Sequence, residues 1–252
     1  MKIASRIILI LFVVIVGLYL AVYAYTGQDE ENWFNTHYRS KIAQYPLMRS
    51  LFYLHWDGDA KSDYLTSNRF SSLKIEIDRY EECLLTDEMF DAIEKGIKKV
   101  VQKPGGIAFE ESNIFSLTKN EYTVEELLAI KETYKDKSSS RNEATIQLVC
   151  VNGYADDPSN IGLTLMENGI GIFWQTIKDL ASNNPDSLEP FVVSTVLHEF
   201  GHQIGMGHIE DDECLMAAFV ERPGNAKGAL KKIPVSFCDE ELKSVEQIRE
   251  SL

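Results

Sequence analysis

Three of the chain's five histidines fall close together, as His198, His202 and His208. The first two are four residues apart, so on a helix their imidazoles lie one above the other. Gly205 follows, and a glycine there lets the chain leave the helix through a positive φ and turn back. We therefore expect His208 to return as a third ligand. Three neutral imidazoles with a fourth corner left for water form a catalytic zinc site.

Glu199, beside the first histidine, supplies the rest of the chemistry. Zinc lowers the pKa of its bound water toward ~7, and a nearby carboxylate can take the proton as general base. The competing interpretation is a surface helix whose histidines are unrelated. A chance match to all five positions is on the order of one in a hundred thousand in a chain this long. We predict one catalytic Zn2+ with Glu199 as the catalytic residue.

The pattern H-E-x-x-H-x-x-G-x-x-H resembles the signature of the metzincin clan of zinc metalloendopeptidases, closest in motif to matrixins and archaemetzincins. Met216, eight residues after His208, is similar to the methionine of the clan's Met-turn. The resemblance implies that Met216 forms a hydrophobic floor beneath the zinc without binding it. It also implies that Gly162–Met166 is an antiparallel edge strand to which an extended peptide adds; the alternative is an ordinary buried hairpin.

The implied fold is α+β: a twisted mixed sheet with backing helices, a zinc-binding active-site helix and an irregular lower C-terminal subdomain. Apolar runs predict strands, and capping residues predict where helices begin. The half-buried pattern at 73–77, the apolar run at 144–152 and the pair 161–167 and 169–174 indicate strands. Thr86, the pair Thr123 and Glu126, and Asp239 are expected to open helices. A further helix from Ser187 or Glu189 leads into the zinc ligands.

The first segment, residues 1–26, is predicted to be a transmembrane anchor or a signal sequence. Lys2 and Arg6 precede an uncharged apolar run from Ile7 to about Tyr25, long enough for a bilayer-spanning helix of ~20 residues. Positive charge on that side predicts a cytoplasmic N-terminus and an extracytoplasmic catalytic domain. A cleaved signal peptide would give a secreted protein instead. The length of the run and its late tyrosines favour an uncleaved, single-pass anchor.

Two further segments complete the predicted organisation. Residues 27–70 are assigned to a juxtamembrane segment with an amphipathic helix around Trp33–Tyr45, and residues 71–252 to the metzincin-like catalytic domain. The formal charge of −14 excludes an electrostatic grip on nucleic acid. The expected partners are a peptide or protein substrate and the membrane, through the N-terminal helix.

Four cysteines are present: Cys83, Cys150, Cys214 and Cys238. The resemblance to archaemetzincins brings in a second, structural zinc held by four cysteines, of which this chain keeps two positions. Glu241 stands where a third would be, so we expect no second zinc. In an exported protein Cys214 and Cys238 are a candidate disulfide. Buried free thiols are the alternative, and a bond between Cys83 and Cys150 is the weaker expectation.

The sequence thus predicts a membrane-anchored, outward-facing zinc endopeptidase. One alternative is a binding module that keeps zinc but does not cut its partner. Glu199 argues against such a module, because a site that needs only the metal has no use for a general base. The other alternative is a zinc hydrolase of a small amide, which a short, closed cleft would favour.

Overall fold

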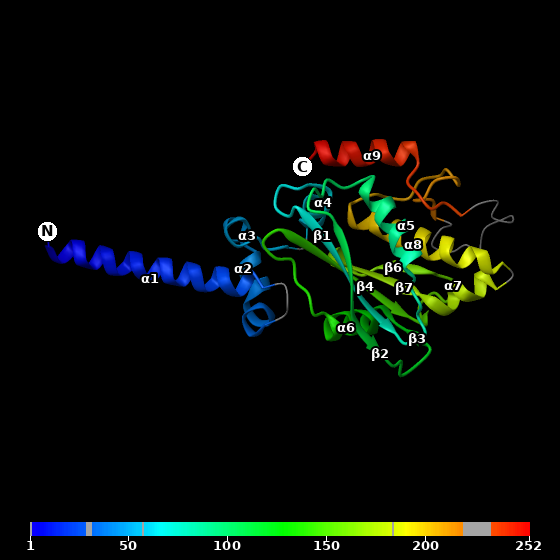
Figure 1. The fold of residues 1–252 in the computed structure, drawn as a ribbon, viewed down its shortest axis with the longest axis horizontal. Helices are drawn as coiled ribbons and strands as arrows, with labels where there is room; N and C mark the ends of the chain where they lie inside the picture. The colour runs from blue at the N-terminus through cyan, green and yellow to red at the C-terminus, as the bar shows by residue number, and fades with distance from the viewer. Residues whose placement is uncertain (1, 29–31, 57, 183, 219–232) are drawn as a thin grey trace.

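A five-stranded sheet in the order β2-β1-β4-β7-β6 forms the centre of the protein in the computed structural model (Figure 1). The structure describes residues 2–28, 32–56, 58–182, 184–218 and 233–252. The sheet strands are β1 (Ser72–Tyr80), β2 (Ile107–Phe115), β4 (Glu143–Val151), β6 (Gly162–Thr164) and β7 (Gly169–Phe173), and β3 (Glu121–Tyr122) pairs with β5 (Gly153–Tyr154). The α-helices are α1 (Lys2–Thr26), α2 (Ser40–Ala43), α3 (Pro46–Phe52), α4 (Ala60–Leu65), α5 (Asp87–Lys98), α6 (Val124–Tyr134), α7 (Trp174–Ala181), α8 (Leu188–Gln203) and α9 (Asp239–Glu250). A π-helix, η1 (Asn35–Arg39), and two 3-10 turns, η2 (Met166–Asn168) and η3 (Pro185–Ser187), complete the elements.

The sheet is mixed but mostly parallel. β1 runs parallel to both β2 and β4, β4 runs parallel to β7, and β6 is the antiparallel edge strand. Parallel neighbours need long crossover connections, which here contain α5 and α6. The fold is therefore better described as mixed α/β than as the expected α+β, because helices alternate with the strands along the chain. The expected mixed sheet with backing helices is present.

The two faces of the sheet have different chemistry. Figure 1 shows α5 and α8 on one side of the sheet and α6 on the other. The first side is apolar and holds the main hydrophobic core, to which β1 contributes Leu73, Ile75 and Ile77. This core also surrounds α8, whose residues from Phe191 to Gly201 are all buried. The helix that carries the first two histidines is therefore fixed by packing from Phe191 to Gly201.

The α6 side of the sheet buries charge, which the sequence did not predict. The alternation in β1 indicates a strand with a solvated polar face, yet Glu76 and Asp78 are both fully buried. The Glu76 carboxylate accepts the backbone N–H groups of Asp136 and Lys137. Gln147 in β4 donates to Asp78 and to a carbonyl of α6. These bonds give both buried carboxylates hydrogen-bond partners, as burial of charged groups requires.

The core extends further toward the N-terminus than residue 71, where the sequence pattern placed the start of the domain. Tyr64, Leu65 and Phe70 have no exposed surface and belong to the main core. The side chain of Lys103 also ties this region down by donating to the carbonyls of Asp63 and Phe70. The six residues of α4 are too few to show a helical hydrophobic period, which is why the pattern missed them.

The described residues before 57 have a small hydrophobic core of their own. α1 includes a span from Ile3 to Thr26 that is long and apolar enough to cross a membrane, with a mean hydropathy of 3.0. We call the described residues 32–56 the collar; Figure 1 shows its helices α2 and α3 around the end of α1. Ala43, Phe52 and Leu54 are buried in a small core of their own, against which Val22 and Tyr23 of α1 pack.

Several expected helix starts can be checked directly. Thr86 caps α5 by accepting the N–H of Met89, and the N–H of Thr123 donates to Glu126 at the start of α6. Both predictions are confirmed. The last helix begins one residue earlier than expected, because Cys238 rather than Asp239 is its N-cap. The expected lower subdomain around 217–234 lies mostly outside the described residues.

Burial raises the pKa of Glu76 from 4.5 to about 7, with the neighbouring Asp78 carboxylate adding to the rise. The carboxyl proton of Glu76 is therefore bound more tightly in the folded protein than in the unfolded chain. As a result, the contribution of Glu76 to the free energy of unfolding falls as pH rises from about 4.5 to about 7. Glu76→Gln can still accept the backbone bonds but carries no charge. We expect its melting temperature, relative to wild type, to rise by roughly 2–6 °C between about pH 5 and about pH 8.

Thermal unfolding followed by circular dichroism across this pH range measures the effect. The matched control is Glu110→Gln on β2, whose pKa is lowered by bonds to Lys137 and Lys74. A difference for Glu76→Gln that stays constant with pH would contradict the assignment.

Candidate metal centre

The three histidines converge on one point. Their Nε2 atoms lie 3.1 Å apart for His198 and His202, 3.3 Å for His198 and His208, and 3.2 Å for His202 and His208. Three ligands at ~2.05 Å from a tetrahedral zinc lie about 3.3 Å from one another. These spacings therefore fit a shared ion. The three residues also form one of two groups of metal-capable side chains within the described part of the chain.

Hydrogen bonds to backbone carbonyls determine which ring nitrogen of His198 and His202 could bind an ion. His198 Nδ1 lies 2.7 Å from the carbonyl oxygen of Leu215, and His202 Nδ1 lies 2.9 Å from that of Met206. A carbonyl only accepts, so in each ring the proton is on Nδ1 and the Nε2 lone pair is left for a metal. His198 is fully buried, whereas His208 is exposed, so the centre opens to solvent on the His208 side.

Gly205 makes the turn that brings His208 back. Its φ is +89°, a left-handed conformation that glycine adopts without steric cost. The N–H of Met206 bonds to the carbonyl of Gly201, and that of Gly205 bonds to the carbonyl of His202. This pair of bonds is the Schellman motif that ends helices. The same turn places the Met206 carbonyl against His202, so it orients one ligand while it redirects the chain toward another.

Met216 lies directly against the zinc-binding helix. A Cβ added to Gly201 would lie 2.2 Å from the Met216 sulfur, so only a glycine leaves room for this contact. Met216 is completely buried. It contacts α8 at Gly201, which lies between His198 and His202 in the sequence. This contact is compatible with the role that the clan resemblance implies.

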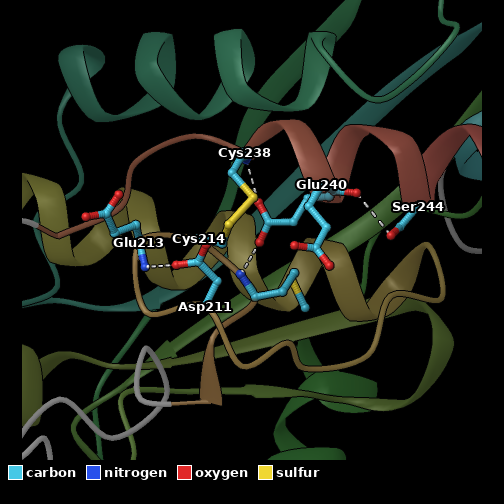
Figure 2. The surroundings of a disulfide bond; sticks show 8 residues. Asp211, Glu213, Cys214, Cys238, Glu240 and Ser244 are labelled. Carbon is cyan, nitrogen blue, oxygen red and sulfur yellow. Dashed lines mark hydrogen bonds between the residues drawn. A yellow bond between two sulfur atoms is a disulfide. The ribbon is translucent and has the colours of Figure 1, made fainter.

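A buried carboxylate holds the methionine loop in place. Glu241, in the first turn of α9, has no exposed surface and accepts the backbone N–H groups of Met216 and Cys238. Figure 2 shows the adjacent disulfide, which joins Cys214 in the loop after the third histidine to Cys238 at the start of α9. Cys83 and Cys150 form a second disulfide. The alternative of free thiols is wrong for all four cysteines of the structure.

Glu199 is held by the edge strand. Its side chain is buried, and the hydroxyl of Thr164 in β6 donates to its Oε2 atom at 2.8 Å. A Cβ on Gly162, two residues earlier in β6, would lie 3.1 Å from Oε1. β6 therefore packs against the carboxylate on both sides. The strand expected at Gly162–Met166 is present over Gly162–Thr164, antiparallel to β7 and at the edge of the sheet.

Three further residues support the centre through long-range contacts that the sequence does not reveal. Thr164 and Glu241 act on residues 35 and 25 positions away. Gln203 donates to the carbonyls of Met166 and Gly169, which fixes the connection between β6 and β7 to α8. A cavity of about 390 Å3 lies elsewhere, between the collar and the α6 side of the sheet, and contains none of the residues of the centre.

Comparisons with known proteins found one family model and several similar folds. The model of peptidase family M54 matches residues 62–247. An archaemetzincin structure from Methanopyrus kandleri is 16% identical with a TM-score of 0.51, and the alignment covers 71% of this chain and 97% of that one. An archaemetzincin from Archaeoglobus fulgidus (14%, TM-score 0.44) and a zinc-dependent peptidase from Methanocorpusculum labreanum (13%, 0.47) each cover 69% of this chain and 99% of their own.

No curated protein matches the chain. The first of these structures shows that the fold is archaemetzincin-like, and a similarity to matrixins is not shown. The family match spans most of the chain. It begins at residue 62, next to the core residues Ala60 and Tyr64 of α4. The chain belongs to peptidase family M54 and is a zinc metallopeptidase.

Proposed function

We propose that this metallopeptidase is a membrane-anchored, outward-facing endopeptidase with one catalytic zinc. The observation that carries the proposal is the convergence of three Nε2 atoms within 3.3 Å of one another, with the carboxylate of Glu199 on the adjacent residue of the same buried helix. His198, His202 and His208 would hold the ion, Glu199 would be the general base, and Met216 the floor.

The chain's own residues divide the chemistry between them. A bound zinc supplies a water of lowered pKa and polarises the scissile carbonyl. Glu199 accepts a proton and passes it to the leaving amine. Thr164 donates to one oxygen of Glu199, which orients the carboxylate for the proton transfer. Nδ1 contacts hold the two helical imidazoles so that they do not rotate when substrate enters.

Strand β6 is well placed to bind the substrate. It is at the edge of the sheet, and an edge strand can accept an extended peptide as an additional strand. Because Thr164 in the same strand contacts Glu199, a peptide paired with β6 would run beside the general base. This arrangement favours a polypeptide substrate over a small amide.

The membrane anchor is supported by contacts of the end of α1. Tyr23 packs against the collar core, and the guanidinium of Arg141 lies 4.4 Å over its ring. Arg39 donates to the carbonyl of Thr26. A signal peptidase cut near Ala24 would remove Tyr23 from these contacts. We therefore favour an uncleaved anchor over a secreted form, with residues 1–26 as the span and the domain beginning near residue 60.

The outward orientation is supported by the two disulfides. Disulfides persist in oxidising compartments and are rare in the cytosol. Both disulfides, Cys83–Cys150 and Cys214–Cys238, lie C-terminal to α1, whereas Lys2 and Arg6 lie at its N-terminal end. The disulfides and the positive charges therefore predict the same topology, with a cytoplasmic N-terminus and an exported catalytic domain.

Replacing Glu199 tests the mechanism. Glu199→Gln preserves size and the contact with Thr164 but removes the base, so we expect zinc to stay bound while kcat falls by roughly 10²–10⁴-fold. Hydrolysis of a peptide library read by mass spectrometry, with metal content measured by atomic absorption, gives both values. Full peptidase activity in Glu199→Gln would overturn the assignment, and zinc-loaded wild type that cuts nothing would favour a binding module.

Replacing a ligand tests the ion site itself. His202→Ala removes one of three imidazoles, so we expect the purified protein to lose its single equivalent of zinc and the thermal stabilisation that zinc gives wild type. His37→Ala is the matched control, because that histidine is exposed on the collar. Equal zinc content in His202→Ala and wild type would contradict the proposed ligand set.

Thr164 is a positioning residue for Glu199. Thr164→Val keeps the shape but loses a hydrogen bond to a charged group, worth about 1.5–3 kcal/mol. We expect kcat to fall by roughly 10–100-fold with zinc content unchanged, and Thr164→Ser to restore most of the loss. A crystal structure of Thr164→Val should show the Glu199 side chain displaced. If KM alone rises, Thr164 acts on the peptide and not on the base.

A further inference from the structure

The collar exposes large apolar and aromatic side chains beside the end of α1. Trp33 is 67% exposed, Tyr45 58% and Leu47 65%. Tyr38 in η1 and Leu51 in α3 are also exposed. A soluble surface rarely gathers such residues in one short segment. Tryptophan and tyrosine at the end of an apolar helix are instead typical of the boundary between membrane and water.

Contacts with α1 fix the level of η1 and of the Phe52 end of α3. Arg39 Nη1 donates to the carbonyl of Thr26, so η1 is level with the end of α1. The ring of Phe52 in α3 lies 5.4 Å from that of Tyr19. Tyr19 precedes Thr26 by about 10 Å along a helix, at 1.5 Å per residue. α3 therefore reaches about two turns back along the anchor from its end.

The length of the apolar helix then decides whether α3 lies in water. A bilayer's hydrocarbon core is about 30 Å thick. From Ile7, the first residue after Arg6, a helix of this length ends at Thr26 at 1.5 Å per residue, and even from Ile3 it reaches about Val22. Ile7 to Leu18 covers only about 18 Å. Tyr19 must therefore enter the membrane if α1 crosses it, and tilting of the helix only deepens its entry.

We propose that the collar is a membrane-binding surface, with α3 and its exposed Leu47 and Leu51 embedded in the outer leaflet and Trp33 and Tyr38 at its boundary with water. The proposal rests on the proposed anchoring by α1. Its partner is the zwitterionic lipid interface, because the chain's charge of −14 disfavours an anionic surface. The exposed Lys41 can extend its ammonium to the headgroups while its carbon chain stays apolar.

Embedding the collar would fix how the catalytic domain stands on the membrane. The collar core contacts α1 through Val22 and Tyr23, and Arg69 of the domain donates to the carbonyl of Leu54. Anchor, collar and domain are thereby joined by direct contacts. The domain would then be held with the N-terminal ends of β1 and β4 toward the lipid, because Arg141, just before β4, contacts Tyr23.

Tryptophan fluorescence of the full chain in vesicles tests the proposal. The variant Trp33→Phe/Leu47→Trp places an indole on α3, and Trp33→Phe alone gives the background from Trp56 and Trp174. The matched control is Trp33→Phe/Leu84→Trp. Leu84 is 62% exposed and follows β1, on the order of 25 Å from the collar end of the sheet. Circular dichroism melting confirms that each variant is folded.

In phosphatidylcholine vesicles with brominated acyl chains, we expect most of the fluorescence added by Leu47→Trp to be lost, and aqueous iodide to have little effect. The Leu84→Trp signal should respond in the opposite way. A Leu47→Trp signal quenched by iodide and not by brominated lipid overturns the proposal. A signal protected from both also overturns it, because a protein surface then covers the collar.

Failure of the anchor is separately visible. Flotation of the vesicles shows whether the chain is membrane-bound at all. A protein that stays at the bottom of the gradient contradicts the anchoring by α1. A protein that floats but exposes Leu47→Trp to iodide keeps the anchor and refutes only the embedded collar.

Discussion

The convergence of the three histidines depends on two hydrogen bonds made by the ring nitrogens that face away from the point of convergence. His198 and His202 each give their Nδ1 proton to a backbone carbonyl, of Leu215 and Met206, and so present Nε2 to one another and to His208. Both carbonyls belong to the chain after α8. The helix sets the spacing of the first two ligands, but the path of the following loop sets their rotation, and the same loop carries the third.

Local chemistry made much of this centre predictable. A four-residue spacing, a glycine that can adopt positive φ and a returning histidine describe one continuous stretch, and the resemblance added Met216 to it. What the sequence could not provide are contacts between distant residues. Thr164 and Glu241 are single polar residues in a strand and a helix, and nothing in their own neighbourhoods distinguishes them from surface residues.

The same limit explains the fold. Alternation in β1 correctly predicted a strand, but it could not show that α6 and the loop after it cover the polar face and turn Glu76 into a buried acid. Residues before the expected start at 71 also contribute to the core, and the sequence pattern did not show them because the six residues of α4 are too few for a helical period. The parallel order of the strands likewise follows from crossover connections, which a reading of individual segments does not reveal.

Glu241 gives the C-terminus an unexpected importance. One of its oxygens receives the N–H of Met216 and the other that of Cys238, so a single side chain connects the methionine loop to the final helix. Arg249, near the end of that helix, donates in turn to the carbonyl of Val100. Helix α9 thus holds the methionine loop in place. A truncation before Cys238 removes the last fifteen residues and with them Glu241 and the disulfide to Cys214. Such a truncation would inactivate the enzyme although no residue of the histidine centre is removed.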